Sequence, residues 1–173
     1  TTSLRGYAMG VLSVETLTEG VHSGNAGGIV PETFRIVRSL LERLEDAATG
    51  QVRVDALHVE IPEERAAQAQ LVADALGNNV HECFPLTEGT SPMGTDLAEL
   101  VLNRTWRPAL AVTGADGLPP LSLAGNVLRP HTRVKISLRI PPTCDPEAAI
   151  AAVKETLEKD PPHGAKVNFG NTG

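Results

Sequence analysis

The stretch 22–28, HSGNAGG, sets one histidine beside a serine and three glycines. Histidine is the side chain whose ordinary pKa lies closest to neutral pH, and glycines let a ligand approach the backbone closely. A phosphate cradle would use the glycines, but the lysine and the Ser/Thr of a P-loop are absent. Ser23 adjoins His22, yet neighbouring side chains point apart and no G-x-S-x-G elbow surrounds the serine. The stretch holds no complete catalytic set, and a tight turn explains its glycines without any ligand.

Other polar residues have metal-ligating chemistry but not the spacing of a metal site. Residues 81–83 read His-Glu-Cys, and His58 and Glu60 occupy alternate positions. No histidine pair has the i,i+4 spacing of a helical zinc site, and there is no C-x-x-C, so we expect no metal site in this chain. Glu63 and Glu64 follow a proline, and acidic residues are favoured in the first turn of a helix for its dipole alone.

Composition excludes several classes of partner. The chain has 173 residues, 41% hydrophobic and 21% charged, with a net charge of −6. An acidic surface disfavours nucleic acid and anionic membranes as partners. No window approaches the roughly 20 apolar residues of a membrane span, and the first residues lack the organisation of a signal peptide. Cys83 and Cys144 form no disulfide framework. We therefore expect a soluble, cytoplasmic domain with free thiols.

Hydrophobic periodicity predicts the elements that must position these side chains. Strands are expected over 7–17, 108–117, 132–142 and 164–169. A helix should begin at Pro31 and end near Gly50, and a second should follow Asp145. The apolar stripe expected on the first helix is Phe34, Val37, Leu40, Leu41 and Leu44. On the second helix, the expected stripe is Ala149, Ile150, Val153 and Leu157.

Residues 51–104 differ in character and are interpreted as a mostly helical excursion from this core. A possible strand over 54–61 precedes a helix over 62–77, and a short helix over 95–104 begins with a capping box, Asp96 and Glu99. Without the excursion, the order is strand, helix, strand, strand, helix, strand. We therefore predict an α+β fold: a two-layer sandwich with a ferredoxin-like βαββαβ core and a four-stranded antiparallel sheet.

This fold has two consequences for the surface. The last long strand, 132–142, alternates strictly, so Arg133, Lys135 and Arg139 should lie on the sheet face without helices. That face is then free to meet a ligand or another domain. The first and last strands should be antiparallel neighbours, which would bring the chain ends close together, as in a domain inserted into a larger protein.

Four segments together resemble the lid, or dimerisation, domain of the zinc amidohydrolase superfamily. They are residues 4–44, with His-Ser-Gly and a Gly-Gly turn before a helix, 106–117 (WRPALAVTGADG), 125–142 (GNVLRPHTRVKISLRIPP) and 160–169 (DPPHGAKVNF). The superfamily includes carnosinase-type dipeptidases, acetylornithine deacetylase and succinyl-diaminopimelate desuccinylase. The length of the excursion is similar to the lids of the dipeptidases.

The resemblance implies that residues 1–173 are one lid domain excised from a metallopeptidase. In the family, the lid interrupts a metal-binding domain that holds two zinc ions. The His-x-Asp of that domain does not occur here, so the chain alone should be inactive. Its implied partners are a second copy, paired through its own helix and edge strand, and its own metal-binding domain. The implied substrate is a small peptide or an N-acyl amino acid.

The resemblance also implies a role for each matching residue. The histidine at the position of His22 reaches the partner's active site and stabilises the oxyanion as water attacks the amide. Asn126 also acts across the dimer on that oxygen, where carnosinase proper has threonine. Arg139 matches an arginine that binds the substrate's terminal carboxylate from the lid of the same subunit. Gly27 and Gly28 would leave room for the substrate backbone and let the lid move.

Two other functions are compatible with the same residues. The chain could be a stand-alone regulatory α/β sandwich in which Arg139 and the glycine turn bind an amino acid without catalysis. A purely structural dimerisation domain would instead be indifferent to changes at His22, Asn126 and Arg139.

Overall fold

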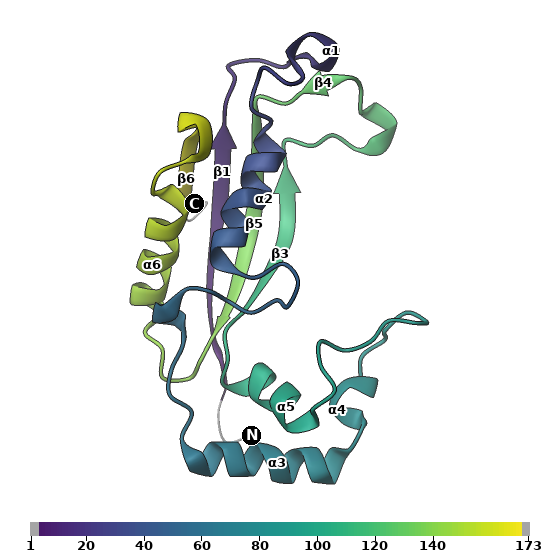
Figure 1. The fold of residues 1–173 in the computed structure, drawn as a ribbon, viewed down its shortest axis with the longest axis vertical. Helices are drawn as coiled ribbons and strands as arrows, with labels where there is room; N and C mark the ends of the chain where they lie inside the picture. The colour runs from purple at the N-terminus through teal and green to yellow at the C-terminus, as the bar shows by residue number, and fades with distance from the viewer. Residues whose placement is uncertain (1–3, 171–173) are drawn as a thin grey trace.

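A single antiparallel sheet forms the centre of the molecule in the computed structural model, which describes residues 4–170. Its strand order is β3-β5-β1-β6 (Figure 1). The strands are β1 (Gly6–Glu15), β3 (Ala109–Asp116), β5 (His131–Ile140) and β6 (Lys166–Gly170). The first and last strands are antiparallel neighbours, as the sequence predicts. This strand order confirms the ferredoxin-like core and its four-stranded sheet.

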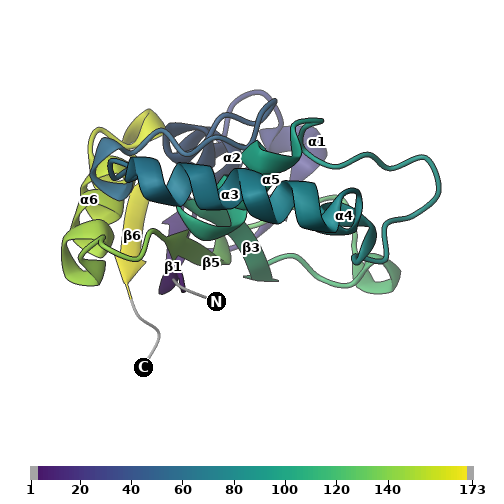
Figure 2. The same cartoon turned by 90° about the horizontal axis from the view of Figure 1, so that it is seen from below.

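Two helices cover one face of the sheet, α2 (Thr33–Leu44) and α6 (Pro146–Glu158). Both begin at acidic caps. The carboxylate of Glu32 accepts hydrogen bonds from the N–H groups of Phe34 and Arg35, and that of Asp145 accepts one from Glu147. Seen from below, the helices lie on one side of the strands and the other side is bare (Figure 2). The predicted two-layer arrangement is therefore present.

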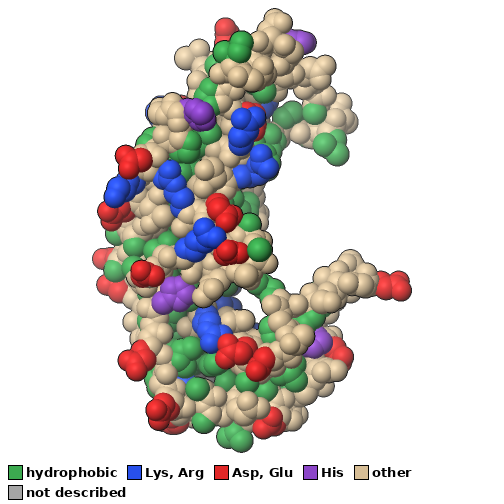
Figure 3. Space-filling view, in the orientation of Figure 1, with side chains coloured by type: hydrophobic (Ala, Val, Ile, Leu, Met, Phe, Trp, Pro, Cys, Tyr) green, Lys and Arg blue, Asp and Glu red, His purple; other side chains and the backbone are tan. Residues whose placement is uncertain are grey.

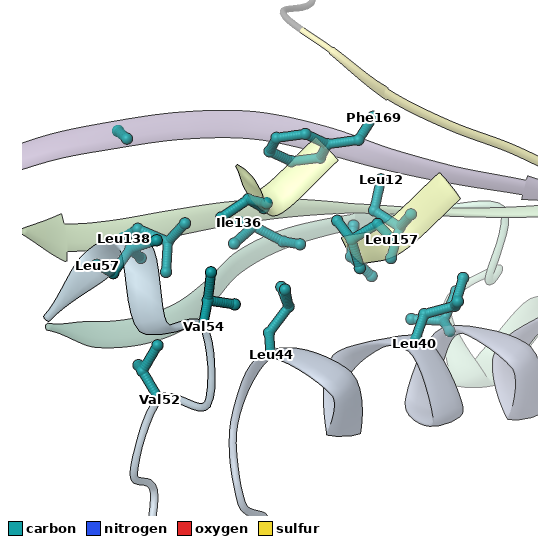
Figure 4. Close-up of a cluster of buried hydrophobic side chains, with 14 of the residues drawn as sticks. Leu12, Leu40, Leu44, Val52, Val54, Leu57, Ile136, Leu138, Leu157 and Phe169 are labelled. Carbon is teal, nitrogen blue, oxygen red and sulfur yellow. The ribbon is translucent and has the colours of Figure 1, made fainter. Parts of the chain in front are cut away.

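The core between the layers is aliphatic, with one aromatic ring. Every second residue of β5 is buried, which confirms the alternation read from the sequence. Figure 4 shows these side chains meeting those of α2, α6 and β6. Fully or almost fully buried are Leu12, Leu40, Leu44, Leu57, Ile136, Leu138, Leu157 and Phe169.

Helix α2, the first helix predicted from the sequence, differs from its prediction at both ends and in which residues are buried. Pro31 lies outside it, because Glu32 provides the cap, and the helix ends at Leu44 rather than near Gly50. Phe34, expected in the buried stripe, is 40% exposed, and Ile36 is buried instead. The buried arc keeps the three- and four-residue spacing but is rotated towards Ile36, because the position of the sheet decides which flank of the helix faces the core.

The excursion forms a second, smaller cluster at one end of the sheet (Figure 1). It contains α3 (Glu63–Leu76), α4 (Asn79–Glu82) and α5 (Leu97–Thr105). Its buried residues are Ala69, Val80, Val101, Leu102 and Trp106. None of the helices described over residues 4–170 is both long and apolar enough to cross a bilayer.

The beginning of the excursion corrects one prediction. The strand expected over 54–61 is absent; a short 3-10 helix, η1 (Asp55–Leu57), occupies part of it. Val52, Val54 and Leu57 are buried in the main core. Val52 and Val54 alternate with exposed residues as in a strand, but Leu57 breaks this spacing, and the segment is a loop that closes the bottom of the sandwich. The helical unit that stands apart from the sheet therefore starts after Leu57, later than the expected residue 51.

A small lobe stands at the opposite end of the sheet. It contains β2 (Val21–His22), β4 (Val127–Leu128), the single-turn helix α1 (Ser23–Ala26) and the 3-10 helix η2 (Leu121–Leu123). The two short strands pair antiparallel, with His22 opposite Val127. One more 3-10 turn, η3 (Pro162–Gly164), leads into β6. The molecule is hollowed on the side of β3, between this lobe and the excursion (Figure 3).

Candidate functional site

His22 ends the short strand β2 and caps the turn that follows. Its Nδ1 accepts a hydrogen bond of 3.1 Å from the backbone N–H of Gly24. A neutral imidazole that accepts at Nδ1 carries its proton on Nε2, so this ring presents one N–H donor. The side chain is exposed at the tip of the lobe. His22 is thus held at its backbone and Nδ1 while Nε2 is free to donate.

Asn126 lies directly beside His22. The N–H of Ser23 donates to the carbonyl oxygen of Asn126 at 2.9 Å, next to the rung between His22 and Val127. The backbone of Asn126 makes this contact, so its exposed side-chain amide remains available. The structure therefore brings together two of the residues that the sequence singled out, from segments about a hundred positions apart.

The two glycines after this turn have different structural reasons. The N–H of Gly27 donates to Ser23 O at 2.8 Å, and a Cβ there would lie 2.6 Å from that oxygen. Gly28 has φ of +83°, a left-handed conformation that favours glycine, and a Cβ there would meet nothing within 4 Å. Gly27 is required by the turn itself, whereas Gly28 combines backbone freedom with open space.

Arg139 lies at the other end of the sheet, on its bare face. It is exposed and pairs in register with Tyr7 on β1 and Ala109 on β3. Arg139 is eight residues from His131, where β5 starts beneath the lobe, so at about 3.4 Å per residue the two ends are roughly 27 Å apart. The structure does not bring Arg139 together with His22 and Asn126 within one copy.

Two further arginines lie near Arg139 and were not found from the sequence. The Nη1 of Arg5 donates to the carbonyls of Asn103 and Arg107, at 3.0 and 3.2 Å. Burial lowers the pKa of Arg5, and the positive charges of Arg139 and Arg104 lower that pKa further. No sequence spacing connects residues 5, 104 and 139. Only the fold, which sets the end of α5 against the start of β1, brings these charges together.

The other candidate ligands do not form a site. Across residues 4–170, no three His, Cys, Asp or Glu side chains converge as metal ligands would. His58 Nε2 lies 2.7 Å from the carbonyl oxygen of Val52, which explains that histidine as a structural contact. Glu63 and Glu64 occupy the first turn of α3, as expected for a helix dipole. The donors of the described part of the chain do not fit a metal ion.

Comparison with known proteins decides the family. The family model of the peptidase dimerisation domain of M20 peptidases matches residues 2–165. The chain belongs to this family. A curated relative, cysteinylglycine-S-conjugate dipeptidase of Corynebacterium striatum, is 28% identical over 175 residues, which cover all of this chain and 36% of the relative. The region that matches this chain is thus only a part of that longer relative.

Solved structures show the same fold at lower identity. Human carnosine dipeptidase 1 aligns with a TM-score of 0.77 and 22% identity, over 98% of this chain and 37% of its own. The di-peptidase Dug1p of Saccharomyces cerevisiae aligns with a TM-score of 0.75 and 19% identity, over 100% and 38%. This dimerisation domain spans a little over a third of the length of these relatives.

Proposed function

We propose that this dimerisation domain is the lid of a metal-dependent hydrolase that cleaves dipeptides or N-acyl amino acids. In this proposal the lid joins two copies of the enzyme and contributes residues to both active sites. A pair of zinc ions, held by the metal-binding domain outside this chain, would supply the water-activating chemistry. The family assignment supports the joining role, and the placement of His22 and Arg139 supports the shared sites.

The separation of His22 from Arg139 is the observation that carries the proposal. His22 lies in the lobe beyond the His131 end of β5, and that end is about 27 Å from Arg139 along the strand, whereas an extended dipeptide spans roughly 7 Å. One small substrate cannot contact both residues of the same copy. A two-fold axis reverses one copy relative to the other, so the lobe of one copy can meet the Arg139 end of its partner.

The edge strand β3 offers the surface for such pairing. It is bonded only to β5 in the described sheet, and most of its residues are exposed. Phe34 extends this surface onto α2. Arg43 of the same helix donates to the carbonyl oxygen of Asp160, just after α6, so its side of α2 faces α6. Phe34 precedes Arg43 by nine residues, which at 100° per residue places it on the opposite side of α2. Phe34 therefore faces away from α6. Antiparallel contact of two β3 edges, flanked by two Phe34 rings, would place each Arg139 end beside the partner's lobe.

Each side chain has a chemical role that follows from its geometry. His22 Nε2–H and the Asn126 amide would donate to the carbonyl oxygen of the scissile bond as it gains negative charge. A preorganised donor of this kind contributes about a hundred- to a thousandfold in rate. The Arg139 guanidinium would bind the terminal carboxylate through two parallel hydrogen bonds. Gly28 leaves room for the substrate backbone beside the histidine.

Complementation between subunits tests this arrangement in the full-length enzyme. His22→Ala and Arg139→Ala should each inactivate the homodimer. A mixed dimer of the two variants keeps one intact site, with His22 from one chain and Arg139 from the other. Random pairing at equal amounts should then restore about a quarter of wild-type activity. If both residues acted within one copy, every site of every mixed dimer would lack one of them and mixing would restore nothing.

A further inference from the structure

A large hollow lies between the excursion and the end of the sheet. Its volume is about 720 Å³, larger than three other hollows of about 430 to 440 Å³. This size falls in the range of roughly 300 to 1,000 Å³ typical of small-molecule pockets. The proposed roles of His22, Asn126 and Arg139 do not use it. We call it the excursion hollow, and its floor is the loop 49–52, with Ala109 at the start of β3.

The wall on the excursion side is apolar and exposed. Phe84, Leu86 and Met93 line the hollow and are 51%, 45% and 76% exposed. All three come from the segment after α4 and face the same hollow. Large exposed apolar patches on soluble proteins usually mark binding surfaces. The hollow therefore offers apolar contact to a ligand of moderate size.

The rim is positively charged, although the whole chain carries a net charge of −6. Arg5, Arg104 and Arg107 line the hollow, against one carboxylate, Glu99. Glu99 pairs with Arg107 at 2.6 Å. Neither Arg5 nor Arg104 has an acidic partner among residues 4–170. Two guanidinium charges at the rim thus have no counter-charge in the described protein.

Arg5 has hydrogen-bond donors to spare. Both of its hydrogen bonds, to the carbonyls of Asn103 and Arg107, come from Nη1. A guanidinium has five N–H donors in a planar fork, so Nε and Nη2 retain theirs. The two bonds also hold the group in place against the end of α5. A fixed, partly desolvated guanidinium beside an apolar wall suits an anionic group that is attached to an apolar body.

From this geometry we infer that the excursion hollow binds a small carboxylate that carries an apolar group. The carboxylate would bond to Arg5 and Arg104, and the apolar group would contact Phe84, Leu86 and Met93. A free fatty acid and a peptide with an apolar C-terminal residue share this chemistry. A neutral apolar ligand would leave both guanidinium charges unpaired, and a cationic one would be repelled by them.

Calorimetric titration of the 173-residue chain tests the inference with matched probes. Octanoate and octylamine have the same apolar chain and opposite charge, and glycyl-leucine represents the peptide source. Octanoate, glycyl-leucine or both should bind saturably, and octylamine should not. Trp106 is the only tryptophan of the chain and packs in the cluster that includes Leu100, a residue of the hollow. Its fluorescence should therefore change along the same binding curve.

Variants with matched controls locate the site. Arg104→Gln should weaken binding of the carboxylate about tenfold, the value of one charge-assisted hydrogen bond, whereas Arg35→Gln on exposed α2 should not. Phe84→Ala should weaken binding of octanoate, whereas Leu121→Ala, at a position 96% exposed on η2, should not. Absence of saturable binding of both carboxylates at millimolar concentration would overturn the inference. Equal binding of octylamine, or equal effects of the variants and their controls, would do the same.

Discussion

The backbone N–H of Ser23 donates a 2.9 Å hydrogen bond to the carbonyl oxygen of Asn126, and this contact ties the histidine turn to the segment before β4. It forms next to the rung between His22 and Val127, so the two short strands carry His22 and Asn126 as one unit. Because only backbone atoms make these two contacts, the side chain of Asn126 can be replaced without breaking them. The side chain of His22 differs, since its Nδ1 also accepts the hydrogen bond from Gly24 that caps the turn.

Asn126→Ala should lower kcat of the proposed full-length enzyme about a hundredfold, the lower end for loss of one oxyanion donor. The melting temperature should not change, because the carbonyl of residue 126 still accepts the bond from Ser23. Steady-state kinetics and thermal unfolding of the same preparation provide both values. Asn25→Ala is the matched control, since Asn25 is an exposed asparagine of the same lobe. Wild-type turnover in Asn126→Ala would remove this residue from the proposed mechanism.

Gly10→Ala should destabilise the domain by about 1 to 3 kcal/mol, the usual range for overpacking a core. A Cβ at Gly10 would lie 2.4 Å from Cζ of Phe169, whose ring is buried between β6 and the helices. Urea unfolding measures the loss. Gly125→Ala is the control, because a Cβ there meets nothing within 4 Å.

The steric explanation can be separated from a loss of backbone freedom. Phe169→Leu should cost stability on its own, but should cost less in the Gly10→Ala background, because the smaller side chain makes room for the new methyl group. If the two free-energy changes were simply additive, the contact between Gly10 and Phe169 would not be the cause.

The fold was predictable where a local sequence pattern is compatible with only one secondary structure. The strict alternation of residues 131–140 indicates a strand with one buried face, and Asp145 before Pro146 indicates a helix start. The pattern fails where tertiary packing chooses among equivalent residues. Phe34 and Ile36 are both apolar, and only the position of the sheet decides that Ile36 is the buried one. Val52 and Val54 likewise alternate with exposed residues in a loop, because a loop can cover a core as a strand does.

The residues of the candidate site could likewise be predicted only in part. His22 and Asn126 could be proposed because recognisable motifs surround both, and their proximity then follows from the pairing of β2 with β4. The arginines at the other end carry no such motif. Arg5 and Arg104 meet only because α5 ends against the start of β1, a contact between segments about a hundred residues apart. Long-range placement of this kind leaves no periodicity or spacing to detect.

Thr33 and Thr132 should show strong coupling, because they form a buried polar pair. Both are 0% exposed, and their hydroxyl oxygens are 2.8 Å apart, between the start of α2 and β5. Thr33→Val or Thr132→Val alone leaves one buried hydroxyl without its partner and should cost about 1 to 3 kcal/mol. The double variant removes both hydroxyls and should cost less than the sum of the single variants. Chemical denaturation of all four proteins gives the coupling energy, and simple additivity would contradict it.

Acid should weaken the loop that forms the floor of the excursion hollow. The carboxylate of Asp46 accepts a 2.7 Å hydrogen bond from Arg53 and bonds of 2.9 Å from the N–H groups of Ala48 and Thr49. The hydrogen bond from Arg53, followed by those from the backbone, lowers the pKa of Asp46 from 3.8 to about 2. Since the folded-state pKa is the lower one, this stabilisation is present above the unfolded value and is lost as pH falls through about 2.

Thermal unfolding of Asp46→Asn across pH checks this effect. The variant should melt below the wild type at neutral pH, because an amide oxygen can accept from Arg53 but lacks the charge that strengthens this bond. The gap should narrow as pH falls from 3.8 towards about 2, where the wild-type carboxylate is itself protonated. Arg53→Gln should show the same narrowing, since it removes the largest cause of the shift. A gap that stays constant down to pH of about 2 would show that Asp46 stabilises the loop by its shape and not by its charge.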